Sequence, residues 1–214
     1  MWGSVEGVQL AGIVNEAKGD VSGVQVSGIL NKARKVKGVQ VGVVNIADSC
    51  SGFTIGLVNI VKNGIHEFSV FSNEMLPINV AYKSGTRKMY TIVQAGADFS
   101  NDERAYGYGI GLGNELGLGR SFALNTEYVF SSFIVGHGRE LPGVSRLQAM
   151  LRWNGMKGFS IYAGPAISIT APTKALAPDG YKMILPRAGY HTFDPGNAVA
   201  WFGWTIGVNF FDGR

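Results

Sequence analysis

The sequence predicts an all-β protein in which a short glycine-rich β-solenoid repeat array precedes an antiparallel transmembrane β-barrel of about eight strands. Three observations lead to this fold class. Four similar glycine-rich segments follow one another within the first 65 residues, runs of alternating polarity follow from residue 66, and the connections between those runs alternate between short and long. We therefore divide the chain into a four-unit repeat array at 1–65 and a barrel at 66–214.

The composition fits one large β domain, or a barrel with a small appendage. The 214 residues include 31 glycines, and only 16% are charged. No stretch approaches the roughly 18 consecutive apolar residues of a membrane helix, which leaves alternating strands as the way to cross a bilayer. The net charge of +4 comes from scattered residues rather than a basic stripe, which argues against a nucleic-acid partner.

The first ten residues, MWGSVEGVQL, have neither a basic start nor a continuous apolar segment. They do not read as a signal peptide, so a location in the bacterial outer membrane requires that one was removed. Cys50 is the single cysteine, and it cannot by itself form an internal disulfide or a metal cluster.

The repeat array consists of four aligned units of decreasing spacing. GVQLAGIVNEA begins at Gly7, GVQVSGILNKA at Gly23, GVQVGVVNIA at Gly38 and GFTIGLVNIV at Gly52, so the starts lie 16, 15 and 14 residues apart. The units share polar residues at fixed positions, namely Gln9, Gln25 and Gln40, and Asn15, Asn31, Asn45 and Asn59.

Units of this length cannot each bury a core, but stacked units can bury a shared one. Asparagine ladders suit such stacking, and glycines supply sharp corners. The alternative makes each unit one strand of a single barrel of about twelve strands, because ten or eleven residues suffice for a tilted crossing. The recurrence of glutamine and asparagine in register favours the solenoid.

From residue 66 onward the chain reads as eight strands with two faces of opposite character. In SRLQAMLRW, the apolar face holds Leu147, Leu151 and Trp153, and the other face holds Arg146 and Arg152. In AYGYGIGLG, large side chains alternate with glycines that would make room inside a barrel. The expected strands are 66–73, 77–83, 88–99, 105–117, 121–133, 144–153, 158–169 and 199–211.

A sandwich of two sheets would also alternate in this way, so an apolar exterior needs separate support. Aromatic residues gather near strand ends, and the ten residues from Met89 to Phe99 cover roughly 23 Å at a tilt near 45°. Short connections (SGTR, GLGR, NGMKG) alternate with longer ones (NEMLP, SNDER, IVGHGRELPG and 171–198). Bacterial barrels place short turns in the periplasm and long loops outside, which matches this alternation.

The last strand, AWFGWTIGVNFF, resembles the C-terminal insertion signal of outer-membrane barrels, although DGR follows it. Eight strands leave an interior that side chains fill, so a diffusion pore is not expected. Charges in that confined space must be paired. We expect an interior hydrogen-bonded network of Gln94, Asp98, Glu127, Arg146, Gln148 and Arg152.

The repeated GVQxGxxN units, followed by FSVFSNEMLPINVAYKSGTRKMYTIVQAGADF and YGYGIGLGNELGL, resemble the bacterial surface-repeat family of spirochaetes and Bacteroidota. The resemblance extends over nearly the whole chain. It implies a small outer-membrane barrel without assigned catalytic residues, preceded in the natural protein by a signal peptide and by further repeats.

The sequence offers little catalytic chemistry. His66 lies at the junction of array and barrel, His137 lies near Glu140, and His191 lies near Asp194. A histidine, a carboxylate and a serine could form a nucleophilic site, but no GxSxG motif is present. No histidine or cysteine pair has metal-ligand spacing, and no cofactor is expected.

The long segment 171–198 is the candidate binding loop, since loops of this length in compact domains are usually functional or disordered. Its aromatic and cationic residues suit an anionic glycan, lipopolysaccharide phosphates or a protein partner, or alternatively the headgroup level of the membrane. These residues are Lys174, Tyr181, Lys182, Arg187, Tyr190, His191 and Phe193.

The sequence therefore predicts a non-enzymatic outer-membrane protein with a structural or surface-binding role, or a component of a larger outer-membrane complex. Its expected partners are membrane lipid, lipopolysaccharide and other outer-membrane proteins. A barrel-embedded enzyme that modifies lipid A or lipopolysaccharide is one alternative, and a soluble secreted β protein is another.

Overall fold

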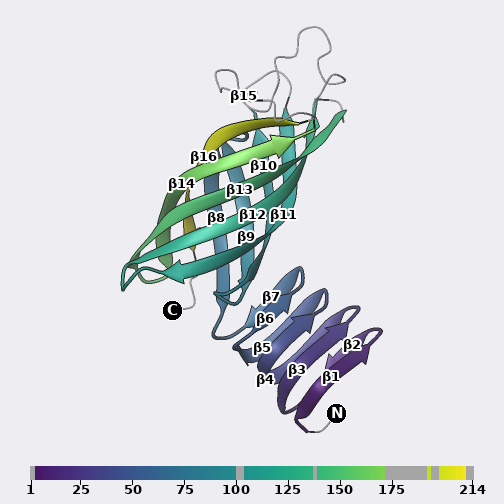
Figure 1. Cartoon of the computed structure of the whole chain (residues 1–214). Coiled ribbons are helices and arrows are strands. Elements are labelled where there is room, and N and C mark those ends of the chain that lie inside the picture. The colour runs from purple at the N-terminus through teal and green to yellow at the C-terminus, as the bar shows by residue number, and fades with distance from the viewer. Residues whose placement is uncertain (1–2, 100–103, 137–138, 172–191, 194–197, 211–214) are drawn as a thin grey trace.

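The computed structural model describes residues 3–99, 104–136, 139–171, 192–193 and 198–210. Over these residues the chain forms two sheets, a parallel one built from the repeats and an antiparallel one that closes into a barrel (Figure 1). The parallel sheet ends at Val61 and the antiparallel sheet begins at Ile65. In the described part of the chain there is no helix long and apolar enough to span a membrane.

The repeats form a β-solenoid, as the spacing of glutamine and asparagine predicted. Equivalent residues of successive units are parallel partners: Gln9 with Gln25, and Asn31 with Asn45. A meander of barrel strands would pair them antiparallel, so the alternative of one barrel with about twelve strands is wrong. The strands are β1 (Val5–Ala11), β2 (Val14–Glu16), β3 (Asp20–Ser27), β4 (Leu30–Val41), β5 (Val44–Cys50), β6 (Phe53–Ile55) and β7 (Val58–Val61).

The glycine that opens each unit is required by the stacking. Gly7, Gly23 and Gly38 have φ angles of 105°, 140° and 150°, which side-chain-bearing residues rarely adopt. A Cβ atom on Gly38 would also collide with the carbonyl oxygen of Gly23 in the coil below it. The coils can therefore approach to sheet distance only because this position has no side chain.

The barrel has eight antiparallel strands, as predicted. Each strand pairs with its neighbour in the chain, and β16 closes the ring by pairing with both β14 and β8. The strands are β8 (Ile65–Asn73), β9 (Ile78–Gly85), β10 (Tyr90–Asp98), β11 (Ala105–Gly117), β12 (Phe122–Val135), β13 (Arg139–Met156), β14 (Phe159–Thr170) and β16 (Val199–Phe210). The two-residue strand β15 (Thr192–Phe193) pairs with β16 outside this ring.

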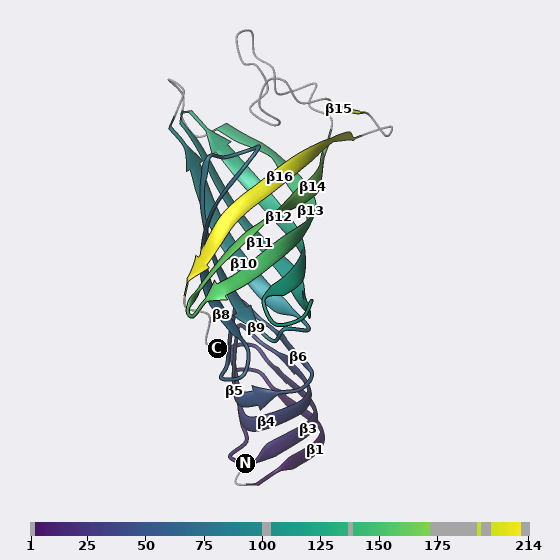
Figure 2. The ribbon, with the colours of Figure 1, turned by 90° about the vertical axis from the view of Figure 1, so that its left-hand side faces the viewer.

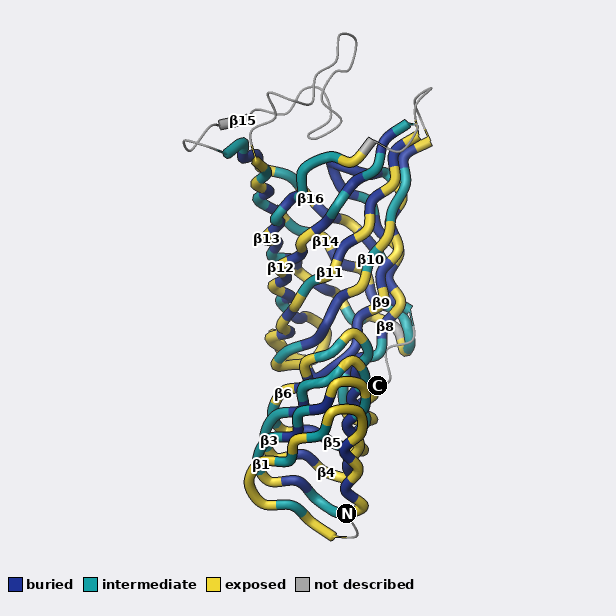
Figure 3. The backbone as a smooth tube through the Cα atoms, turned by 90° about the vertical axis from the view of Figure 1, so that its right-hand side faces the viewer, coloured by how far each residue is buried: buried dark blue, intermediate teal, exposed yellow. Residues whose placement is uncertain are grey.

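The barrel wall has its apolar side chains outside and its charged side chains inside. On β13, Leu147 and Leu151 are 53% and 50% exposed, whereas Arg146 and Arg152 are 2% and 0% exposed. The same alternation of buried and exposed positions runs along the other strands (Figure 3). The apolar face predicted from the sequence is therefore the outer face.

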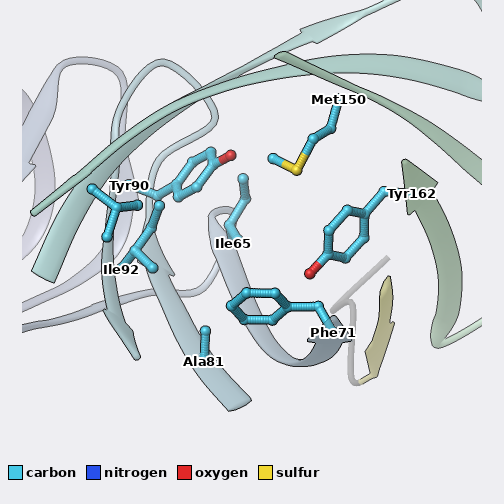
Figure 4. Packing of buried hydrophobic residues seen from close by; sticks show 8 residues of the cluster. Ile65, Phe71, Ala81, Tyr90, Ile92, Met150 and Tyr162 are labelled. Carbon is cyan, nitrogen blue, oxygen red and sulfur yellow. The ribbon is translucent and has the colours of Figure 1, made fainter. Parts of the chain in front are cut away.

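Large side chains from other strands fill the lumen beside β11, whose inward-facing positions are mainly glycines. The inward glycines of β11 make this room, as expected: a Cβ atom on Gly113 would collide with the ring of Tyr90, and one on Gly107 with Phe133. The central cluster joins side chains from β8, β9, β10, β12, β13 and β14 (Figure 4). It consists of Ile65, Phe71, Ala81, Tyr90, Ile92, Val129, Met150 and Tyr162.

The connection between β8 and β9 turns back into the barrel. Its sequence pattern predicts an ordinary external loop, yet Glu74, Met75 and Leu76 are at most 2% exposed. Met75 and Leu76 pack in a second cluster with Phe133 and Trp201. We call residues 74–76 the plug, because they close the mouth opposite the solenoid.

The solenoid lies at the end of the barrel that carries the short turns (Figures 1 and 2). Asn59 of β7 joins the two parts: its backbone N–H donates to Ser84 Oγ at 3.1 Å, and its Nδ2 donates to Thr91 Oγ1 at 3.0 Å. Lys88, in the turn between β9 and β10, donates to the carbonyl oxygen of Ser51 at 2.9 Å. The last coil is thus docked on β9, β10 and the turn between them.

Candidate functional site

The barrel lumen is the most chemically distinctive region of the described chain, because it holds buried charges at three levels. At the central level, Glu127 Oε1 accepts from Lys83 Nζ at 2.5 Å and from the Tyr90 hydroxyl at 2.8 Å. Its Oε2 accepts from Gln148 Nε2 at 2.8 Å, and Asn125 donates to the Tyr90 hydroxyl. Three strands, β9, β10 and β13, thus contribute partners to the carboxylate of Glu127, which satisfies a charge that burial would otherwise make costly.

At the level of the plug, Glu74 and Arg146 form a two-pronged ion pair in which each carboxylate oxygen meets one guanidinium nitrogen. Glu74 also accepts from Trp201 Nε1 at 3.1 Å and from the backbone N–H of Trp204 at 3.0 Å. Arg146 donates to the backbone oxygen of Trp204 at 2.8 Å and to Gln148 Oε1 at 3.1 Å. Gln148 thereby connects the plug to the central level.

This pair also repairs the hydrogen bonding of the barrel wall. The ladder between β16 and β8 runs only as far as Thr205 and Asn73, because β8 ends there. At the next residue of β16, the backbone N–H of Trp204 donates to Glu74 and its C=O accepts from Arg146. A backbone group without a hydrogen bond in lipid costs roughly several kcal/mol. Glu74 and Arg146 therefore also satisfy backbone groups of the barrel wall.

The third level lies toward the solenoid. Arg152 Nη1 donates to Glu67 Oε1 at 2.5 Å and to Glu115 Oε2 at 3.0 Å, and its Nε donates to Asn154 Oδ1 at 2.7 Å. Arg87, in the turn between β9 and β10, lies 3.7 Å from Glu115 and is half exposed. Two carboxylates therefore face two guanidinium groups at this end.

The six residues expected inside the barrel do not form one cluster. Glu127, Arg146 and Gln148 belong to two linked levels, and Arg152 belongs to the third. Gln94 instead contacts β12, where its Nε2 donates to Ser131 Oγ at 3.1 Å. Asp98 is buried at the far end of β10.

Four further buried charged residues of the lumen are not among those expected from the sequence. Glu67 and Lys83 could have been found, because they occupy the inward phase of the alternation on β8 and β9. Glu115 lies in the inward phase of β11, beyond the glycines. Glu74 lies in a connection where no alternation applies, so no local pattern points to its burial.

The space left beside the plug is too small for a substrate. The cavity lined by Asn79, Gln94, Ser131, Phe133 and neighbouring plug residues has a volume of about 10 Å³, which is roughly that of one water molecule.

The catalytic candidates are not brought together in the described part of the chain. His66 lies at the junction of solenoid and barrel, where its Nε2 lies 2.7 Å from the carbonyl oxygen of Val61. Glu140 is exposed on β13, while His137, His191 and Asp194 lie outside the described residues. Within those residues, no group of three or more histidine, cysteine, aspartate or glutamate side chains could hold a metal ion.

Most of the candidate binding loop also lies outside the described residues. Lys174, Tyr181, Lys182, Arg187, Tyr190 and His191 lie outside the described residues. Phe193 belongs to β15, where its backbone is paired with that of Ala200 on β16.

Comparisons with known proteins give structural matches only. No family model matches the chain, and no curated protein matches it. The chain is similar to the crystal structure of Neisserial surface protein A, with 8% identity, a TM-score of 0.41, and coverage of 69% of this chain and 93% of that one. It is also similar to Ail, the attachment invasion locus protein of Yersinia pestis, with 12% identity, a TM-score of 0.30, and coverage of 68% and 93%.

Proposed function

We propose that this chain is a non-enzymatic bacterial outer-membrane β-barrel protein with a structural or surface-binding role. The inverted polarity of the closed barrel carries the proposal. Its outer face exposes large apolar side chains on every strand of the ring, including Tyr108, Phe130, Leu147 and Phe202 at 46–68% exposure. Soluble monomeric proteins rarely expose a contiguous apolar patch larger than roughly a few hundred Å². The apolar surface of this chain, in contrast, extends around the whole barrel.

The inside of the barrel supports the same conclusion. Arg152 is fully buried between Glu67 and Glu115, and Lys83 is 3% exposed beside Glu127. A soluble barrel would place these charges in water and its apolar residues in the lumen. Ring closure by β16 leaves no open sheet edge, which is the condition for a β-sheet to cross a bilayer.

The role we propose follows from where free surface remains. The lumen is filled by side chains and by the plug, so transport through the barrel is not part of the proposal. The proposal assigns binding to the solenoid and, as the sequence predicts, to the segment 171–198. The stacked GVQ units support the resemblance to the bacterial surface-repeat family, to which we propose this chain belongs.

Fractionation and electrophoresis test the membrane proposal. We expect the full chain, expressed with a signal peptide, to fractionate with outer membranes, to require detergent for extraction, and to migrate faster before heating than after it. A folded chain that stays monomeric in buffer without detergent would refute the proposal in favour of the soluble alternative.

Lipid analysis tests the non-enzymatic part. Lipid A and lipopolysaccharide are compared by mass spectrometry between cells with and without the protein, and we expect identical profiles. A new or missing acyl chain or headgroup in the cells that express the protein would establish the enzymatic alternative.

A further inference from the structure

Each solenoid coil has two edges of opposite polarity. Each coil has a sharp bend, at residues 12–13, 28–29, 42–43 and 56–57. We call the residues on both sides of these bends, 8–16, 24–32, 39–46 and 53–60, the turn edge. We call the remainder of each coil the charged edge. The charged edge has an apolar interior of Ala17, Val21, Ala33, Val36, Ala47, Cys50 and Val61, and it exposes the charges of Lys18, Arg34, Lys35, Lys37, Asp48 and Lys62.

The turn edge reverses this arrangement and is mainly apolar on its outside. Its two charged residues, Glu16 and Lys32, are exposed at the boundary with the charged edge and pair with each other at 3.0 Å. One residue of each turn forms a row along the stack: Ile13, Ile29, Val43 and Leu57 are 43–63% exposed. Their alignment is set by backbone hydrogen bonds between successive turns, for example from the Ile29 N–H to the Ile13 oxygen at 3.1 Å. Three steps of about 4.8 Å make this row an apolar ridge roughly 14 Å long.

The inside of the turn edge is a ladder of amides. Asn15 donates to Asn31 Oδ1 at 3.0 Å, Asn31 to Asn45 at 2.9 Å, and Asn45 to Asn59 at 2.8 Å. The ladder ends on the barrel, because Asn59 donates to Thr91 Oγ1. Apolar outside and hydrogen-bonded polar inside is the polarity of the barrel itself.

The position of the turn edge relates it to the lipid-facing wall of the barrel. β6 and β7 of the last coil contact β9 and β10, whose outer faces expose Tyr82 and Val93. In Figure 1 the turns of the coils point up toward the level of the barrel rim, and the charged edge points down and away from it. The turn edge of the last coil, which β6 and β7 form, therefore adjoins the barrel at β9 and β10.

We propose that the turn edge of the solenoid is a second lipid-contact surface, which lies in the interfacial region of the periplasmic leaflet beside the barrel. Amphipathic helices with one apolar and one charged side bind a bilayer in this way, with the apolar side about 5–10 Å into the boundary of headgroups and acyl chains. The solenoid presents the same two-sided polarity on β-strands. Bilayer lipid is the occupant because the turn edge of the last coil adjoins β9 and β10, whose outer faces expose Tyr82 and Val93. The inference rests on the proposed location of the barrel in the outer membrane.

Site-specific lipid quenching tests this inference on the full chain. Cys50 is replaced by alanine, and single cysteines at Ile29→Cys and Val43→Cys carry an environment-sensitive fluorophore. Lys35→Cys on the charged edge is the matched negative control, and Leu147→Cys on the barrel is the positive control. Each variant is reconstituted in phosphatidylcholine vesicles that contain acyl-chain-brominated lipid, and folding is verified by heat-shifted electrophoretic mobility.

We expect the labels at positions 29 and 43 to lose fluorescence nearly as strongly as the label at 147, while the label at 35 is unchanged. Quenching at 147 without quenching at 29 and 43 would overturn the inference and leave the barrel proposal standing. Absence of quenching at 147 would instead refute the barrel proposal. Labels at 29 and 43 that are shielded from aqueous iodide but not quenched by lipid would also overturn the inference, since a protein surface would then cover the ridge.

Discussion

Removing the carboxylate of the plug, by Glu74→Ala, should strongly destabilise the barrel. Glu74 is buried and pairs with Arg146, which is equally buried, so the substitution leaves an uncompensated guanidinium in the lumen. Breaking a buried ion pair on one side costs about 3–5 kcal/mol. The variant also loses the acceptor for the Trp204 N–H and the Trp201 Nε1.

Urea unfolding in lipid vesicles, followed by tryptophan fluorescence, measures this loss. With a slope of roughly 2 kcal/mol/M, a loss of about 4 kcal/mol lowers the unfolding midpoint by about 2 M. The double variant Glu74→Leu with Arg146→Met should cost less than the two single variants added together, because no charge is left unpaired. Glu16→Gln, which affects only an exposed ion pair with Lys32, should leave the midpoint unchanged.

Two results would refute this reasoning. The first is a midpoint for Glu74→Ala that matches the unsubstituted chain, which would mean that the plug does not seal the barrel. The second is strict additivity of the single variants, which would mean that Glu74 and Arg146 do not act as a pair.

Further substitutions test the solenoid. Asn45→Ala interrupts the amide ladder and strands its neighbours' buried polar groups, so we expect a loss of about 1–3 kcal/mol in the thermal or urea unfolding of the solenoid, with none if the ladder is not formed. Gly38→Ala should abolish regular stacking, seen as lost protection from proteolysis, whereas Gly117→Ala, which meets nothing within 4 Å, should be tolerated. The hydrogen bond and charge of Lys62 lower the pKa of the Asp48 carboxyl, and the stabilisation from this pair is present above the unfolded-state pKa and lost as pH falls through the folded one. Lys62→Met should return the pKa of Asp48 to its ordinary range in carbon-detected NMR titration, and an unchanged pKa would show that the pair does not form in solution.

The sequence predicts the stacking of the solenoid repeats but not the direction in which their strands pair. The spacing of Gln9 to Gln25 and of Asn31 to Asn45 predicts that equivalent positions stack, and they do. The spacing alone is also compatible with extra barrel strands, because both arrangements need units of ten or eleven residues. Only the parallel pairing in the structure distinguishes them.

The barrel was predictable wherever period-two alternation holds. Arg146, Gln148 and Arg152 lie inside, and Leu147 and Leu151 lie outside, as their positions on one strand require. Alternation assigns a residue to a face but not to a level along the barrel axis. The level depends on strand tilt and stagger, which are properties of the closed ring.

The sequence by itself therefore determined the all-β class, the division of each strand into two faces, and the recurrence of the repeats, because these follow from local periodicity. The tertiary structure decided which charges meet. Glu67 reaches Arg152 across 85 positions of the chain, and Glu74 reaches Arg146 across 72. Those pairs exist only because β16 closes the ring and the connection after β8 turns inward, which brings distant residues to the same level of one lumen.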